Sequence, residues 1–111
     1  MGDHRNLNVL EAARLVADEI NRLLDSTPRV LHAERLRGSS QAISANISEA
    51  FGRGKEGGRD HWLRVARSES EKTIRHLRAN YAAGRIRRNP FWPLGDRLVT
   101  ISKMLSSLLR T

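Results

Sequence analysis

The stretch at residues 34–54, ERLRGSSQAISANISEAFGRG, decides the fold. Its apolar and small side chains recur at spacings of four and three residues, which places them on one face of an α-helix. That face consists of Leu36, Ser40, Ile43, Ile47 and Ala50, with Phe51 at its end. A second stripe beside it carries short polar and bidentate groups, which favours hydrogen bonds to a neighbouring helix or to a ligand. This polar stripe consists of Arg35, Ser39, Asn46, Glu49 and Arg53.

Three further segments repeat the helical spacing of apolar residues, and none alternates with the period of two that marks a β-strand. Together the four segments predict helices over about residues 7–25, 31–52, 60–83 and 90–109. Pro28, a glycine-rich run and Gly84 separate them, since proline and glycine interrupt helices. Four amphipathic helices with short connections predict an all-α fold, an antiparallel up-down-up-down four-helix bundle, with residues 1–111 as a single domain.

The composition narrows the class of protein. The chain has 111 residues and no cysteine, which suits one domain without a disulfide framework or a thiolate metal site. The start of the chain lacks the apolar run of a signal peptide, and no apolar stretch approaches the roughly 20 residues that span a bilayer. We therefore expect a soluble, cytoplasmic protein with no membrane partner.

The charge is high and unevenly distributed. Lys and Arg number 20 against 12 Asp and Glu, a net charge of +8. Residues 1–34 contain four basic and six acidic side chains, a net −2, whereas residues 35–111 contain 16 and six, a net +10. All but three of the basic residues are arginine, whose planar guanidinium suits phosphate oxygens and flat rings. This segregation predicts a polyanionic partner, RNA or DNA.

Arginines of the third predicted helix form one stripe, opposite the apolar face that runs from Leu63 to Tyr81. The stripe contains Arg64, Arg67, Arg75 and Arg78, with Glu71 as the acid among them. The connection that follows adds Arg85, Arg87 and Arg88. We predict that these seven arginines bind nucleic acid. The alternative is an ordinary solvated helix face, the commonest explanation of a charge run.

Two aromatic residues, Phe91 and Trp92, come directly after these arginines. The chain has only five aromatic residues, two Phe, two Trp and one Tyr. Because small domains usually bury such rings, we expect both to cover the end of the core. The alternative is that they stack on unpaired bases.

Catalytic and metal-binding patterns are weak. The paired spacing of metal ligands is absent from the four histidines, His4, His32, His61 and His76. Glu49 and Glu69 could converge as a carboxylate pair, but a di-metal bundle site also needs a Glu-x-x-His set. The run GRGKEGGR at residues 52–59 follows no strand, which argues against a nucleotide-binding loop. We predict no enzymatic activity, catalytic residue, metal or cofactor; a site formed only between subunits is the enzymatic alternative.

Two interpretations of the polar stripe remain open. Arg53 lies at the glycine-rich turn, where it could contact a phosphate. Alternatively, Glu49 and Arg53 pair at i, i+4 spacing and Asn46 makes an interhelical bond, so that the stripe sets helix register or a subunit contact. We favour this structural role, which involves Arg35, Asn46, Glu49 and Arg53.

The stretch RLRGSSQAISANISEAFGRG resembles the signature of the small four-helix-bundle family encoded in intervening sequences of bacterial 23S rRNA genes. That signature runs roughly L-R-R-A-A-x-S-I-x-x-N-I-x-E-G-x-G-R. The matching residues are Leu36, Arg37, Ile43, Asn46, Ile47, Glu49, Gly52 and Arg53. Leu63 and Ala66 fit the next helix of the family, and ISKML at residues 101–105 fits its last helix. The chain departs from the family pattern at Gly38, Ala42, Ala50, Glu69 and Lys72.

This resemblance implies a homo-oligomer, typically a ring of five bundles, and no enzymatic activity. The family includes relatives of the accessory proteins of diversity-generating retroelements, which bind nucleic acid and the reverse transcriptase of the element. We therefore expect a homopentameric nucleic-acid-binding scaffold, an accessory factor of a reverse transcriptase or of an RNA-processing complex. The alternative is a protein–protein adaptor whose arginine-rich face binds an acidic protein.

Overall fold

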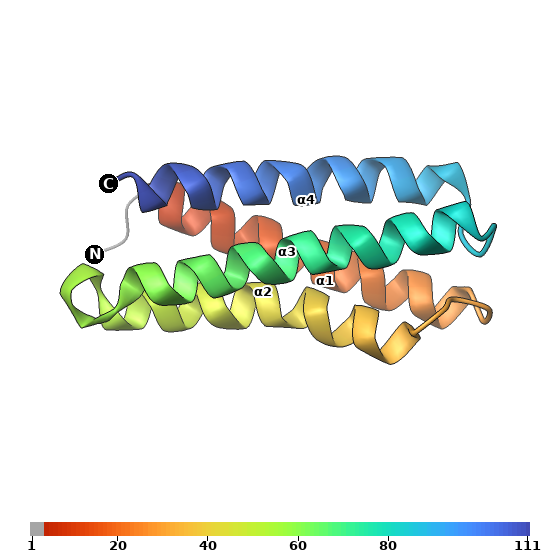
Figure 1. The fold of residues 1–111 in the computed structure, drawn as a ribbon, viewed down its shortest axis with the longest axis horizontal. Coiled ribbons are helices and arrows are strands. Elements are labelled where there is room, and N and C mark those ends of the chain that lie inside the picture. The colour runs from red at the N-terminus through yellow and green to blue at the C-terminus, as the bar shows by residue number, and fades with distance from the viewer. Residues whose placement is uncertain (1–3) are drawn as a thin grey trace.

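The computed structural model describes residues 4–111, which form four long α-helices lying side by side (Figure 1). Helix α1 spans His4–Ser26, α2 spans Ala33–Arg53, α3 spans Arg59–Ala82 and α4 spans Arg88–Leu109. A 3-10 helix, η1, spans Lys55–Gly57 between α2 and α3. These bounds lie within three residues of the predicted ones, and the described residues include no strand. The all-α four-helix bundle is confirmed.

Each helix packs against its neighbours in sequence, and α4 also packs against α1, which closes the bundle. The bundle measures 44 × 21 × 18 Å. The α1–α2 and α3–α4 connections lie at one end, and η1 and the C-terminus lie at the other (Figure 1). Within residues 4–111, no helix combines the length and the apolar composition that crossing a membrane requires.

The core consists of the predicted apolar faces. Helix α2 contributes the stripe that its spacing predicts. Leu36, Ser40, Ile43, Ile47 and Ala50 are buried, and Phe51 at the end of the stripe is partly buried. The largest completely buried side chains from the other helices are Val9, Ile20, Leu63, Leu77, Leu94, Leu98, Ile101, Leu105 and Leu108. Burial of these side chains is the main favourable contribution to folding, at about 25 cal/mol per Å² of apolar surface.

Backbone conformations at the helix ends follow from residue chemistry. Gly84 has a φ of +71°, and the Arg85 N–H donates to the Asn80 carbonyl at 2.8 Å. This Schellman arrangement is the usual helix ending at glycine. Asn89 has φ −108° and ψ 100°, because the proline that follows disfavours helical conformation. His32 is the one non-glycine residue with a positive φ, 53°, in the part of the chain that the structure describes.

Buried hydroxyl groups connect α3 to both of its neighbours. Ser70 donates to the Leu98 carbonyl of α4 at 3.1 Å and accepts a hydrogen bond from Ser102 at 3.0 Å. On the other side, Thr73 donates to the Ser39 hydroxyl of α2 at 2.9 Å. The sequence predicted an interhelical polar network on the stripe of α2, but the observed network is centred on α3. Ser39 is the member of the α2 stripe that takes part in it.

Two aromatic residues differ from the prediction. Tyr81 is 40% exposed, and the buried position at the end of α3 belongs to Asn80, which is 1% exposed and lies three residues after the core residue Leu77. Trp92 is 59% exposed, whereas Phe91 is buried as predicted. Consecutive helical residues point about 100° apart, so only one ring of the Phe91–Trp92 pair can face the core.

Candidate nucleic-acid interface

The predicted arginine stripe lies along α3. Arg64, Arg75 and Arg78 are exposed, and within residues 4–111 no carboxylate forms an ion pair with any of them. Arg67 differs, because it is half-buried and its Nη1 donates to Ser106 Oγ of α4 at 3.2 Å. Three arginines of the stripe are therefore available to an anionic ligand, and Arg67 also contributes to helix packing.

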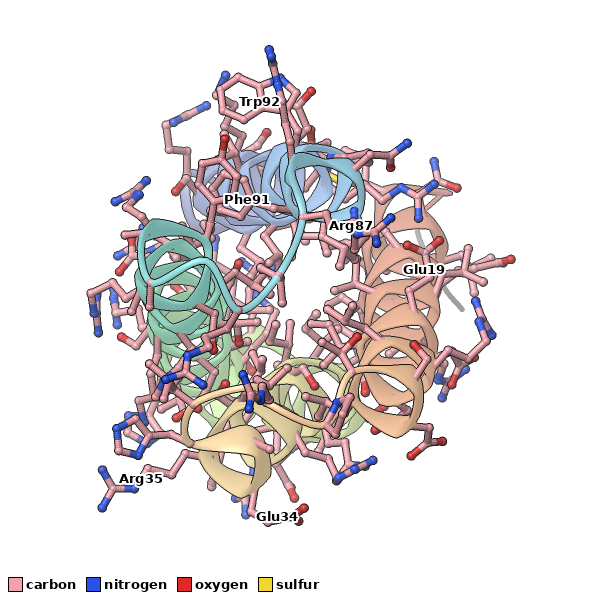
Figure 2. The ribbon with its side chains drawn as sticks, turned by 90° about the vertical axis from the view of Figure 1, so that its right-hand side faces the viewer. Glu19, Glu34, Arg35, Arg87, Phe91 and Trp92 are labelled. Atoms are coloured by element: carbon pink, nitrogen blue, oxygen red, sulfur yellow. The ribbon has the colours of Figure 1, made fainter. Side chains whose placement is uncertain are left out.

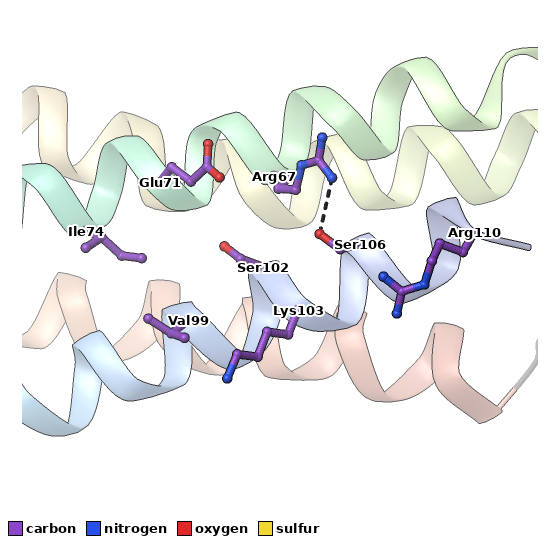
Figure 3. Close-up of a pocket in the computed structure, with 8 residues that line it drawn as sticks. All are labelled: Arg67, Glu71, Ile74, Val99, Ser102, Lys103, Ser106 and Arg110. Carbon is purple, nitrogen blue, oxygen red and sulfur yellow. Dashed lines mark hydrogen bonds between the residues drawn. The ribbon is translucent and has the colours of Figure 1, made fainter.

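A groove between α3 and α4 extends this basic surface (Figure 3). Its volume is about 520 Å³, and it is lined by Arg67, Glu71, Ile74, Val99, Ser102, Lys103, Ser106 and Arg110. Lys103 is an exposed residue of α4, and Arg110 is exposed directly after the end of that helix. Neither residue was among the predicted site residues, although their spacing of seven could have identified them. With Arg67 they give the groove three basic side chains against the single acid Glu71.

The α3–α4 turn forms a second basic region at one end of the bundle. Arg85, Arg87 and Arg88 are all exposed there. The Arg88 guanidinium lies 5.8 Å from the centre of the Trp92 ring, within the range of a cation–π contact. Figure 2 looks onto this end and shows Trp92 projecting away from α4.

The exposed Trp92 ring is supported by other aromatic rings. The ring centres of Phe91 and Trp92 are 6.0 Å apart. Tyr81 stacks on Phe91 with nearly parallel rings, whose centres are 4.4 Å apart. A small groove of about 150 Å³ beside Trp92 is lined by Ile74, Arg78, Phe91, Trp92, Gly95, Asp96 and Val99. Arg78 of the α3 stripe therefore lies beside Trp92, which also contacts Arg88 of the α3–α4 turn.

The polar stripe of α2 shows three different local environments. Glu49 and Arg53 form the predicted i, i+4 ion pair at 2.9 Å, and the Arg53 guanidinium lies 5.4 Å from the centre of the Trp62 ring. Asn46 donates to the Ala42 carbonyl of its own helix at 2.7 Å. Within residues 4–111 the predicted interhelical bond of Asn46 is therefore not formed, and its amide bonds to a carbonyl of its own helix instead. A role of this stripe in a subunit contact stays a prediction.

The structure brings two histidines together that the sequence did not connect. His32, at the start of α2, and His76, on α3, have ring centres 6.5 Å apart. Burial lowers the pKa of His76 below 6.5, and the nearby His32, Arg35, Lys72 and Arg75 lower it further. Among the described residues, no group of three or more His, Cys, Asp or Glu is placed to hold a metal ion; the His4 side chain lies outside the described part.

A further basic residue, Arg59, has a structural role that the sequence did not reveal. Its Nη2 donates to the Leu108 carbonyl at 3.0 Å, near the end of α4, and lies 2.9 Å from an Asp60 carboxylate oxygen. The Arg59 side chain is only 14% exposed. No local signal predicts this contact, because the two residues that it joins are 49 positions apart.

The fold and this surface define a small, basic four-helix-bundle protein with its arginines concentrated on α3 and the α3–α4 turn. The chain matches the family of 23S rRNA-intervening sequence proteins over residues 5–107 and belongs to that family. A comparison with curated proteins finds no match. Among solved structures, the chain is similar to a protein of unknown function from the S23 ribosomal protein family of Bacteroides thetaiotaomicron. The TM-score is 0.89 at 21% identity, over 96% of this chain and 99% of that chain, which shows a shared fold.

Proposed function

We propose that this protein is a non-enzymatic, cytoplasmic scaffold that binds single-stranded RNA or DNA along α3 and the α3–α4 turn. In this proposal it acts as a homo-oligomer, a ring of five bundles. Its partner is a reverse transcriptase or another RNA-processing enzyme, as for the accessory proteins of diversity-generating retroelements. The family membership supports the four-helix-bundle scaffold. The exposed arginines and Trp92 support a nucleic acid as the ligand.

The observation that carries the proposal is the exposed Trp92 beside unpaired arginines. Trp92 is 59% exposed because Phe91 takes the core-facing position beside it, so its indole ring is accessible to a stacking base. Proteins that bind single strands combine basic side chains along the backbone with aromatic rings on which bases stack. Trp92 offers the ring, and Arg78 and Arg88 lie beside it.

The strength and selectivity of binding follow from this chemistry. Phosphate contacts position a nucleic acid without reading its sequence, so binding should depend little on base sequence. One bundle presents a small number of phosphate contacts, which gives modest affinity. A ring repeats the same surface in each copy, and the repeated contacts raise the overall affinity through effective concentration.

The test is a filter-binding titration of single-stranded RNA and DNA at several salt concentrations. Each phosphate that the protein neutralises contributes a slope of about −0.7 in log affinity against log salt for single strands. The double variant Arg64→Gln/Arg78→Gln should bind more weakly and reduce the slope by about 1.4. The control is Arg14→Gln/Arg22→Gln, which removes the same charge from exposed residues of α1.

The outcomes are distinct. Weaker binding in the α3 variant, with unchanged binding in the α1 control, supports the proposal. Absence of binding by the native protein at low salt contradicts it, and favours the adaptor alternative in which the arginine face meets an acidic protein. Equal losses in both variants would show that net charge, and not this surface, determines binding.

A further inference from the structure

We propose that His32, Arg35, Lys72, Arg75 and His76 form a phosphate-binding site, separate from Trp92 and the α3–α4 groove, that binds its ligand more tightly as His76 becomes protonated. The ligand class is a phosphate group, either free pyrophosphate or the backbone of a nucleic acid. The site itself does not depend on the proposed function; only its use with a nucleic acid does.

The cluster consists of two short columns on neighbouring helices. His32 and Arg35 lie one turn apart at the start of α2, and Lys72 and His76 lie one turn apart on α3. The ring centres of His32 and His76 are 6.5 Å apart. Two N–H groups that share one anionic oxygen, each at about 2.8 Å, fit between rings at this separation. The geometry therefore allows one phosphate oxygen to bridge both imidazoles.

The charges around His76 are almost all positive. The groups that lower the pKa of His76, after burial itself, are His32, Arg35, Lys72 and Arg75. One carboxylate lies nearby, Glu69, and it pairs with Lys72 at 3.2 Å. Glu34, at the start of α2, is paired instead with Arg37 at 3.5 Å, and its side chain is 85% exposed. Such a concentration of like charge repels itself, and a bound anion would remove that repulsion.

The backbone holds His32 in this place at a cost in conformational energy. His32 has a φ of 53°, a left-handed conformation that non-glycine residues adopt only with strain. The preceding residue, Leu31, is fixed because its N–H donates to Asn80 Oδ1 and its carbonyl accepts from Asn80 Nδ2. Asn80 follows His76 by one helical turn on α3. The same clamp therefore orders the loop and brings the two imidazoles together.

A metal ion fits this cluster less well than an anion. Two imidazoles could bind a transition metal, but Arg35, Lys72 and Arg75 would repel a cation. No third His, Cys, Asp or Glu joins the pair within residues 4–111. The free N–H groups in the first turn of α2, next to His32, add partial positive charge to the same place.

The experiment follows the imidazole resonances by NMR while pyrophosphate, or a short oligothymidylate, is added at about pH 5.5 and about pH 7.5 at constant ionic strength. Pyrophosphate should raise the apparent pKa of His76. Because one pKa unit corresponds to a tenfold change in affinity, we expect about tenfold tighter binding at the lower pH.

The double variant His32→Asn/His76→Gln removes both imidazoles and should lower this ratio of affinities below about twofold. Asparagine is chosen at position 32 because it tolerates the left-handed conformation. His61→Gln, an exposed histidine at the other end of α3, is the control and should behave as the native protein.

Each outcome separates this site from the proposed function. Tighter binding of both probes at low pH supports the site and assigns it to nucleic-acid backbone; tighter binding of pyrophosphate alone supports it with a free phosphate ligand. A pH effect that is equal in His32→Asn/His76→Gln and His61→Gln overturns the site, and leaves salt-dependent oligonucleotide binding at about pH 7.5 untouched. If the double variant does not fold, Arg35→Gln replaces it, because Arg35 is exposed. Unchanged pyrophosphate affinity at low pH in that variant also overturns the site.

Discussion

Asn80 of α3 holds both backbone polar groups of Leu31, in the connection between α1 and α2. The Leu31 N–H donates to Asn80 Oδ1 at 2.6 Å, and Asn80 Nδ2 donates to the Leu31 carbonyl at 3.2 Å. The Asn80 amide also donates to the His76 carbonyl at 2.9 Å. This one buried side chain thus joins a loop to a helix 49 residues away, and it sets where α2 begins.

Replacing Asn80 by Ala should lower the free energy of unfolding by about 2 kcal/mol. The change removes two tertiary hydrogen bonds, each worth about 1 kcal/mol net, and the N–H and carbonyl of Leu31 must then bond to water. Urea unfolding followed by circular dichroism measures the loss. A change below about 0.5 kcal/mol, the usual range for a neutral surface site, would show that the loop is held by other contacts.

Asn46→Ala is the matched comparison and tests a different hypothesis. Because Asn46 bonds within its own helix and alanine is the better helix former, the stability of the single bundle should change by less than about 0.5 kcal/mol. The predicted subunit contact would instead appear as a smaller particle in light scattering after size-exclusion chromatography. An unchanged particle size would exclude Asn46 from that contact.

The free energy of unfolding should decrease as the pH is lowered, because of His76. Its pKa in the folded state lies below the ordinary 6.5, so the unfolded chain takes up the proton first as the pH decreases. Stability is therefore greatest above pH 6.5 and declines from there down to the lowered pKa of the folded state. Urea midpoints across this range should decline less in His76→Gln than in the native protein. The same decline in both proteins would assign the effect to other groups, and His61→Gln serves as the control.

His32→Gly should stabilise the fold and weaken the proposed phosphate site. A left-handed conformation costs a non-glycine residue about 1–2 kcal/mol, part of which glycine loses again through its greater freedom when unfolded. The expected net gain is about 0.5–1 kcal/mol in urea unfolding. His61→Gly, in regular helical conformation near the start of α3, should instead lose about 0.3–0.5 kcal/mol. A loss at both positions would mean that the His32 ring contributes packing that outweighs the strain.

Helix positions could be predicted because their causes are local. The repeat of Leu36, Ile43 and Ile47 specifies both a helix and its buried side, and proline or glycine specifies where each helix ends. Which of two adjacent residues is buried depends on tertiary packing. Phe91 and Trp92 are both suited to a core, and the orientation of α4 against the bundle determines that Phe91 is the buried one. Neither ring could have been assigned from composition.

The candidate sites were predicted unevenly for the same reason. The stripe of Arg64, Arg75 and Arg78 lies on one helix, so its spacing revealed it. The His32–His76 pair joins two helices through the Asn80 clamp, and no spacing within either segment predicts it. Interhelical hydrogen bonds were assigned to α2 because its polar residues are numerous, whereas Ser70 and Thr73, which make them, look like ordinary small residues of an apolar face.

Trp92→Ala provides the most direct test of base stacking. The side chain is 59% exposed, so the change should alter the free energy of unfolding by less than about 0.5 kcal/mol. Affinity for single-stranded RNA should fall by about 1–3 kcal/mol, the usual contribution of one stacked base. The salt dependence should stay unchanged, because the indole carries no charge. Leu15→Ala, which changes an exposed apolar residue of α1 away from this surface, should bind as the native protein does. In a Trp62→Phe background, Trp92 is the only tryptophan, and its fluorescence should be quenched as RNA binds. Native affinity in Trp92→Ala, or unquenched fluorescence at saturation, would remove Trp92 from the interface and leave the arginines as its only basis.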